Sequence, residues 1–187
     1  MQFETINTPR LTLRILTPDG HAYVMNRYND DEIMAFFGFT ASEDLDKERH
    51  RHNKGTTMFN KSFVIFHIID NASGKVIGSC NYHTWYTEHN RAEIGYILTD
   101  ETFRGKGIMG EALPPVLDYG FSTMNLHRVE ALVGPTNEPS LKLIRKMGFQ
   151  YEGHLREHYF KNGSMEDSLI FSLLKSEYLQ QKRQNGL

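Results

Sequence analysis

A run of small and basic residues in the middle of the chain, Phe103-Arg104-Gly105-Lys106-Gly107-Ile108-Met109-Gly110, has the composition of a phosphate-binding turn. Glycine has no Cβ, so a ligand can approach the backbone closely. If a helix begins in this run, its first amides lack partners within the helix, and together with the helix dipole they favour an anion such as a pyrophosphate. The run therefore predicts a turn that binds phosphate groups at the start of a helix.

Two better-known phosphate motifs fit this run less well. The P-loop pattern Gly-x4-Gly-Lys-Ser/Thr does not occur in the chain. Gly105, Gly107 and Gly110 match the dinucleotide fingerprint Gly-x-Gly-x-x-Gly, but that fingerprint should follow the first strand of a βαβ unit. Here it lies in mid-chain, and the acidic residue at the expected distance, Glu130, falls inside a strand-like run. A dinucleotide site is therefore disfavoured, whereas a surface turn without a ligand stays open on this motif alone.

Four further segments place the run in a wider pattern. They are TPRLTLR at 8–14, AEIGYIL at 92–98, NEPSLKLIRKMGF at 137–149 and YEGHLR at 151–156. With the glycine run, they resemble the GNAT superfamily of acyl-CoA-dependent N-acyltransferases. The first and last segments are similar to its RimJ/RimL-like branch, which contains ribosomal-protein N-terminal acetyltransferases.

This resemblance implies an enzyme that transfers an acetyl group from acetyl-CoA to a primary amine by direct attack, without a covalent intermediate. The acceptor implied by the branch is a protein N-terminal α-amine. A small amine, such as a polyamine, an amino acid or an antibiotic, is the alternative. A non-catalytic acyl-CoA-binding regulatory module is a further alternative, and no metal is expected.

In the family, the glycine turn binds the CoA pyrophosphate and the asparagine of a later helix meets the pantetheine arm. Met109 stands where most members have Gly or Ala, a replacement that RimJ/RimL-like sequences tolerate. The residues that the resemblance assigns to the cofactor are Ile97, Leu98, Thr99, Arg104, Gly105, Lys106, Gly107, Ile108, Met109, Gly110, Asn137 and Ser140.

Three residues are candidates for the catalytic work itself. Attack on a thioester needs a neutral amine, so a base must take the proton of the substrate ammonium. Glu93 matches a base glutamate of some family members, although it could instead be a structural carboxylate paired with Arg91 or Arg128. Asn137 matches a pantetheine-binding asparagine and is also a good helix N-cap. Ser140 is the residue that the RimL-like branch would use to support the departing thiolate.

The position of Ile144 is an informative departure from the family. Many members place a tyrosine there as the general acid, and an isoleucine cannot donate a proton. The acid role would then move to Ser140 or be left to water.

The periodicity of the chain predicts a mixture of strands and helices, and the resemblance implies an α/β (α+β) fold of the GNAT type. We expect a mixed, mostly antiparallel sheet of about seven strands, flanked by about four helices. In the family, the fourth and fifth strands, here 91–99 and 127–133, splay apart to admit the pantetheine arm. The whole chain, 1–187, is expected to be a single domain, with a core over about 8–175 and a fraying polar tail over 176–187.

Two local predictions concern helices. A helix that starts at Ser42 is expected to run to about Phe59, and one over 107–123 contains Pro114 and Pro115 in its interior. An interior proline removes a hydrogen bond and crowds the preceding turn, so we expect a kink or break near Gly110.

Composition excludes some classes of function. The formal net charge of −2 gives no support for nucleic-acid binding. A single cysteine, Cys80, excludes an internal disulfide and fits a reducing compartment. No apolar run approaches the length of a membrane span, so we expect a cytoplasmic protein. We also expect it to be a monomer or a homodimer. His50 and His52 lie two apart on a predicted helix, where they point away from each other, and we predict no metal site.

Overall fold

The computed structural model of the chain describes residues 1–55, 61–161 and 163–184. Within these ranges, eight strands form one sheet and six α-helices flank it, more than the predicted seven and four. The strands are β1 (Thr5–Asn7), β2 (Leu11–Leu16), β3 (Lys61–Asp70), β4 (Val76–Tyr86), β5 (Arg91–Leu98), β6 (Arg128–Val133), β7 (Gln150–Lys161) and β8 (Ser164–Leu174). The helices are α1 (Pro18–Arg27), α2 (Asp30–Phe37), α3 (Ser42–Lys54), α4 (Ile108–Ser122), α5 (Glu138–Lys146) and α6 (Lys175–Gln184).

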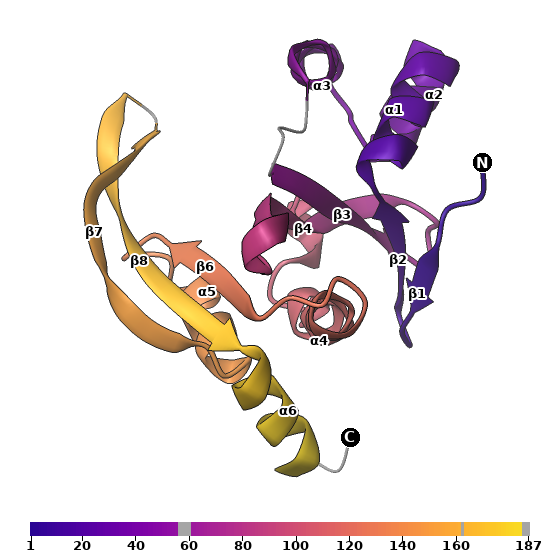
Figure 1. Cartoon of the computed structure of the whole chain (residues 1–187). Coiled ribbons are helices and arrows are strands. Elements are labelled where there is room, and N and C mark those ends of the chain that lie inside the picture. Colours follow the sequence, from indigo (N-terminus) through magenta and orange to yellow (C-terminus); the bar gives the residue numbers. More distant parts are fainter. Residues whose placement is uncertain (56–60, 162, 185–187) are drawn as a thin grey trace.

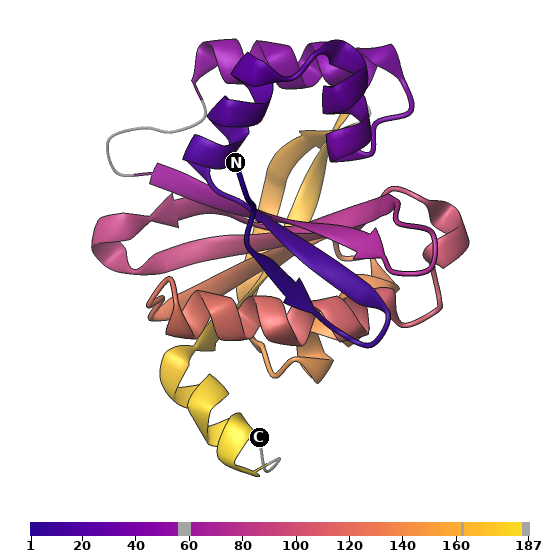
Figure 2. The ribbon, with the colours of Figure 1, turned by 90° about the vertical axis from the view of Figure 1, so that its right-hand side faces the viewer.

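The sheet is mixed and mostly antiparallel, as predicted, with strand order β1-β2-β3-β4-β5-β6-β8-β7. Helices α1, α2 and α3 lie against one face and α4 against the other (Figures 1 and 2). Because successive side chains of a strand point to opposite faces, each strand contributes one set to each layer. Ile65 packs against the cluster under α1–α3, whereas Phe66 belongs to the core under α4.

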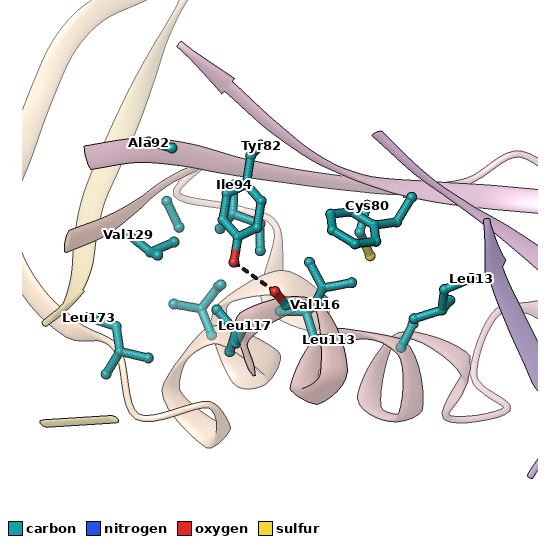
Figure 3. Close-up of a cluster of buried hydrophobic side chains, with 14 of the residues drawn as sticks. Leu13, Cys80, Tyr82, Ala92, Ile94, Leu113, Val116, Leu117, Val129 and Leu173 are labelled. Atoms are coloured by element: carbon teal, nitrogen blue, oxygen red, sulfur yellow. Dashed lines mark hydrogen bonds between the residues drawn. The ribbon is translucent and has the colours of Figure 1, made fainter. Parts of the chain in front are cut away.

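The larger core fills the α4 face of the sheet. Buried apolar residues from β2–β6 and β8 meet the inner side of α4, as Figure 3 shows for one cluster of them. Tyr82 is fully buried there, and its hydroxyl donates a hydrogen bond of 3.0 Å to the carbonyl of Val116 on α4. This bond satisfies the one polar atom that the ring brings into the core.

The predicted splay between two parallel strands is confirmed. β5 and β6 pair only at Arg91 with Arg128, Ala92 with Val129 and Glu93 with Glu130. Beyond Glu93, β5 continues to Leu98 without a β6 partner, while β6 pairs along its whole length with β8. The sheet therefore opens just past Glu93, between the halves of the sheet seen at the left and right of Figure 1.

Helix α4 does not break at its prolines, so the predicted break near Gly110–Glu111 is wrong, whereas the alternative of a kink stays a prediction. The helix is continuous from Ile108 to Ser122 with Pro114 and Pro115 inside. Pro114 is exposed, and the opposite side of the helix is buried against the sheet. Burial of that apolar side stabilises the helix enough to offset the hydrogen bonds that the prolines remove.

We expect Pro114→Ala to stabilise the protein. The alanine restores a backbone N–H to the helix at an exposed position. An interior proline destabilises a helix by about 3 kcal/mol. Part of this cost is offset, because proline also restricts the unfolded chain. The expected gain is about 2 kcal/mol, which for a chain of this length raises the melting temperature by roughly 4–8 °C. Thermal unfolding measures the change in melting temperature, and Pro115→Ala is the paired variant. An unchanged or lower melting temperature would show that the proline ring packs favourably here.

The predicted fraying tail is also wrong, because residues 175–184 form α6. The Tyr178 ring stacks on Phe121 of α4 at a centroid distance of 4.7 Å. The Tyr178 hydroxyl donates to Asp118 at 3.0 Å, and Lys182 forms an ion pair with the same carboxylate at 2.7 Å. These contacts hold a polar helix that its own sequence would not stabilise. α3 ends at Lys54 with Gly55 as its C-cap, and the predicted end near Phe59 lies outside the described residues.

Candidate functional site

The glycine run forms a turn directly before α4, as its sequence predicts. Gly105 and Gly107 have φ angles of +73° and +75°, a region that glycine adopts without strain. Gly107 is the N-cap of α4, and no described side chain caps the helix. A Cβ built at Gly105 or Gly110 would meet no described atom within 4 Å, so space is open in front of the turn. The first amides of α4 are therefore available to an anion, and the turn fits a pyrophosphate.

A contact from the N-terminal part of the chain fixes this turn. The Arg10 guanidinium donates to the Lys106 carbonyl at 2.9 Å and to Glu111 of α4 at 2.6 Å. The backbone N–H of Arg10 and the Thr8 hydroxyl also donate to Glu111, at 2.8 and 2.6 Å. Burial raises the pKa of Glu111, but these hydrogen bonds outweigh it and hold the pKa below its ordinary value. This contact was not predicted, because Thr8 and Arg10 were noted only as part of the segment that resembles the family.

The basic residues of the turn are exposed. The Arg104 side chain is 61% exposed and pairs with Glu101 at 2.8 Å, so part of its charge is already compensated. Lys106 lies over the Phe103 ring at 5.6 Å. At the end of β5, Ile97 is 56% exposed and Leu98 pairs with Gly78 of β4. The backbone amide of Thr99 donates to the Ile77 carbonyl at 3.0 Å.

A cavity of about 310 Å³ lies where β5 and β6 separate. We call it the transfer cavity. Its wall brings together Glu93 of β5, and Asn137 and Ser140 at the start of α5, which the sequence analysis had grouped only by resemblance. His83 of β4 and Tyr96 of β5 also line it, and neither was predicted.

Glu93 is the carboxylate at the point of separation. Burial and the negative charge of the neighbouring Glu130 raise the pKa of Glu93 from its ordinary 4.5 to about 7. Arg91 and Arg128 do not pair with Glu93. Each lies 2.9 Å from Glu130 instead, so the alternative of a structural ion pair with these arginines does not apply to Glu93. A carboxyl with a pKa near neutrality is suited to exchange protons with an amine.

His83 faces Glu93 across the β4–β5 ladder, with its Nδ1 3.7 Å from a Glu93 oxygen. Burial lowers the pKa of His83. A Cβ at Gly95 would lie 2.9 Å from the His83 Nε2, so the absence of a side chain at Gly95 leaves room for the ring. The ladder is irregular just after His83, where Thr84 has a φ of +49°, and such a bulge can re-aim a side chain beside a site.

The start of α5 forms the other wall of the cavity. The Asn137 side chain accepts a hydrogen bond from the Ser140 amide at 3.2 Å, so Asn137 is the N-cap that its residue type predicts. Ile144 is fully buried in the core and cannot exchange a proton. The Tyr96 hydroxyl has no hydrogen-bond partner within the described ranges, and Ser140 lies near enough to affect its pKa.

A second cavity, of about 520 Å³, lies on the α1–α3 face of the sheet, and we call it the acceptor-side cavity. His83 lines both cavities, so both border this residue. Glu48 of α3 is 6% exposed there and contacts His21 at 2.7 Å and Arg51 at 2.9 Å. The side-chain oxygen of Asn81, also in this wall, is buried and has no partner among the described residues.

The described residues contain no group of three or more His, Cys, Asp and Glu side chains that could hold a metal ion. That the protein binds no metal remains a prediction. No helix in residues 1–55, 61–161 and 163–184 is both long and apolar enough to cross a lipid bilayer.

Comparisons with known proteins agree with this geometry. The family model described as an acetyltransferase (GNAT) domain matches residues 10–150. An uncharacterized N-acetyltransferase, p20 of Bacillus licheniformis, is 36% identical over 94% of this chain and 98% of its own. The spermidine N(1)-acetyltransferase of Vibrio cholerae is 29% identical over 91% and 96%.

A solved structure of spermidine N-acetyltransferase from Vibrio cholerae in complex with CoA and spermine has a TM-score of 0.66 and 27% identity, covering 92% of this chain and 99% of that one. The putative ribosomal N-acetyltransferase YdaF of Bacillus subtilis is 34% identical, but over only 56% and 57% of the two chains. A ribosomal-protein-S5-alanine acetyltransferase structure from Vibrio fischeri is matched over 94% and 98% of the two chains, but its 24% identity supports the fold alone. Among the curated relatives described above whose names state a substrate, the spermidine acetyltransferase is matched over more of both chains than YdaF, which favours the small-molecule alternative over the predicted protein N-terminus.

Proposed function

The chain belongs to the GNAT acetyltransferase family, and on that premise we propose that it acetylates a small primary amine of the polyamine class, using acetyl-CoA as the donor. The observation that carries the choice of acceptor is the acceptor-side cavity, which shares the lining residue His83 with the transfer cavity. Its volume, about 520 Å³, is that of a pocket for a small molecule.

The turn at 105–110 and the start of α4 would bind the pyrophosphate of acetyl-CoA, and Asn137 and Ser140 would meet its pantetheine end. The thioester then lies in the transfer cavity, where β5 has no β6 partner. Glu93 takes the proton of the bound ammonium, and the neutral amine attacks the thioester carbonyl directly. The raised pKa of Glu93 supports this role, because a base near neutrality accepts the proton without holding it too tightly.

Two features of the acceptor-side cavity favour an amine with a second nitrogen. The unpartnered Asn81 oxygen, which no described residue contacts by a hydrogen bond, can accept one from a second ammonium or amine group. Glu48 provides a buried negative charge in the same wall, already shared with His21 and Arg51. A buried acceptor without a partner is costly, and a ligand that donates to it recovers that cost.

The predicted acceptor, a protein N-terminal α-amine, is the second candidate. It is supported by the partial match to YdaF and by the long β7–β8 hairpin, whose Tyr159 and Phe160 are 45% and 75% exposed. An extended peptide could lie along such an exposed surface.

We expect the protein to turn over spermidine faster than peptides with free Ser, Ala or Met N-termini, in an assay of thiol release from acetyl-CoA. Hexylamine is the matched control, since it has one primary amine and no second nitrogen. Its kcat/KM should be about tenfold or more below that of spermidine, the effect of one hydrogen bond to a charged group. Turnover on peptides alone would replace the small amine by the protein N-terminus, and acetyl-CoA binding without any turnover would remove the enzymatic role.

A further inference from the structure

The transfer cavity opens to both faces of the sheet, and the two ends carry different chemistry. Glu93 is on the same face as His83, its partner across the ladder, and His83 lines the acceptor-side cavity on the α1–α3 face. Tyr96 is three residues further along β5, so its side chain projects to the opposite face, where it packs with the core under α4. The base for the amine and the Tyr96 ring therefore lie on opposite sides of the opening.

The Tyr96 hydroxyl is in an unusual position for a buried polar group. It is shielded from solvent and no described residue forms a hydrogen bond with it in the ligand-free protein. A buried hydroxyl without a partner is destabilising, and most such groups in folded proteins are satisfied. Ser140 lies in the same cavity wall, close enough for its hydroxyl to lower the pKa of Tyr96, although the two hydroxyls do not reach hydrogen-bond geometry in the ligand-free protein. Ser140 and Tyr96 therefore border the same space, in which the thioester is proposed to lie.

Few groups on this side of the sheet can supply a proton to a departing thiolate. Asn137 is the N-cap of α5, and Ile144 is apolar and buried. Cys80 of β4 also faces Tyr96, but it is fully buried in the core. Tyr159 of β7 also lines the cavity, but it lies near Glu93, whose charge helps to raise the pKa of Tyr159, and so it is on the side of the base. Ser140 remains, and a serine hydroxyl gives up its proton readily only when another donor replaces that proton.

We propose that Tyr96 is a positioning residue that orients the Ser140 hydroxyl and replaces its proton as CoA thiolate leaves. This inference rests on the proposed acetyl transfer and on the place of Ser140 beside the thioester. It assigns a role to a residue that the sequence did not single out. It also provides a proton donor for a chain in which Ile144 occupies the position where many family members have a general-acid tyrosine.

The amine nitrogen forms a bond to the thioester carbonyl carbon, and the carbon–sulfur bond breaks with its electron pair going to sulfur. Sulfur takes the Ser140 proton, and Ser140 takes the proton of Tyr96. The nitrogen loses two protons in all: the ammonium proton passes through Glu93 to water before the attack, and Glu93 takes the second as the amide forms. When the products leave, Glu93 releases this proton to solvent and Tyr96 regains one from solvent, so one proton is released per turnover. Burial raises the pKa of Tyr96, so the phenol holds its proton at neutral pH between turnovers.

A double-mutant cycle tests the coupling between the two hydroxyls. Single-turnover rates are measured for the full-length protein, Tyr96→Phe, Ser140→Ala and the double variant, with spermidine and saturating acetyl-CoA. We expect Tyr96→Phe to lower the rate about tenfold when Ser140 is present, the effect of one hydrogen bond to a charged group, and to have little effect in the Ser140→Ala background. The KM for acetyl-CoA should stay within about twofold, and the melting temperature should not fall, since the lost hydroxyl has no partner among the described residues.

Tyr151→Phe is the matched control. It removes the same phenol oxygen from a ring that is 58% exposed on β7, and the rate should be unchanged. Three results would overturn the role of Tyr96. Tyr96→Phe could lower the rate equally with and without Ser140, it could lower the rate together with the melting temperature, or it could leave the rate unchanged. If the wild-type protein acetylates no amine, the proposed function fails first, and the two failures are thus distinguishable.

Discussion

Replacing Glu93 by glutamine is expected to lower kcat/KM for the amine by about 10³-fold at pH 8, within the range of a lost general base. The wild-type kcat/KM should fall as pH drops below the Glu93 pKa of about 7, because the protonated carboxyl can no longer accept a proton. The Glu93→Gln variant should lack this inflection, and its rate should rise with pH only as the fraction of free amine rises. Steady-state kinetics between pH 5 and pH 9 measure both effects, and acetyl-CoA binding should be unchanged.

The same substitution should raise stability, with an effect that depends on pH. Folding raises the pKa of Glu93 above its unfolded value, so the native state holds the proton more tightly. The native state therefore loses stability as pH rises from about 4.5 to about 7, and the full loss remains above pH 7. A glutamine at this position does not ionise, so the variant has no such loss. After allowance for the partial solvent exposure of the group, the variant should be more stable by roughly 1–2 kcal/mol at pH 8 and little changed at pH 5.

Glu130→Gln is the informative companion to this variant. The negative charge of Glu130 contributes to the raised pKa of Glu93, and its loss leaves Arg91 and Arg128 without that partner. The acid inflection of kcat/KM should therefore move to lower pH while the base itself is retained.

A wild-type pH profile in the Glu93→Gln variant would exclude Glu93 as the base.

Local patterns in the sequence predicted the elements that hold this site. The glycine run predicted its turn, Asn137 its N-cap, and the alternation of the strands a sheet, whereas the opening of that sheet beside Glu93 was implied by the family resemblance. The turn, the N-cap and the strands depend on residues within a few positions of one another, and such short-range signals can be recognised in a single sequence.

Features that depend on distant contacts were missed or wrong. His83 meets Glu93 only because of the β4–β5 register and the bulge that follows it. The Arg10–Glu111 contact joins residues that are 101 positions apart. α6 is a helix because Tyr178 and Lys182 reach Asp118, and α4 stays intact because its inner side is buried. In each case tertiary packing overrides the local preference of the segment.

The phosphate-binding turn can be tested without disturbing the catalytic groups, through Gly110→Asp. Gly110 is the third residue of α4, its φ is not in the left-handed region, and a Cβ there would meet no described atom within 4 Å. An aspartate in the first turn of a helix is favourable to the helix dipole, so the fold should be retained or slightly stabilised. Its negative charge, however, would stand where the pyrophosphate is proposed to bind.

Two like charges about 5 Å apart repel by roughly 3 kcal/mol at an effective dielectric constant of about 20, so acetyl-CoA affinity should fall roughly 200-fold. Gly110→Asn is the control, since it adds a side chain of the same size without the charge, and it should lose far less affinity. S-acetyl-pantetheine, which lacks the pyrophosphate, should react equally well with both variants. Equal acetyl-CoA affinity in the two variants would contradict a phosphate site at 105–110 and would return this turn to the surface loop that its motif alone left open.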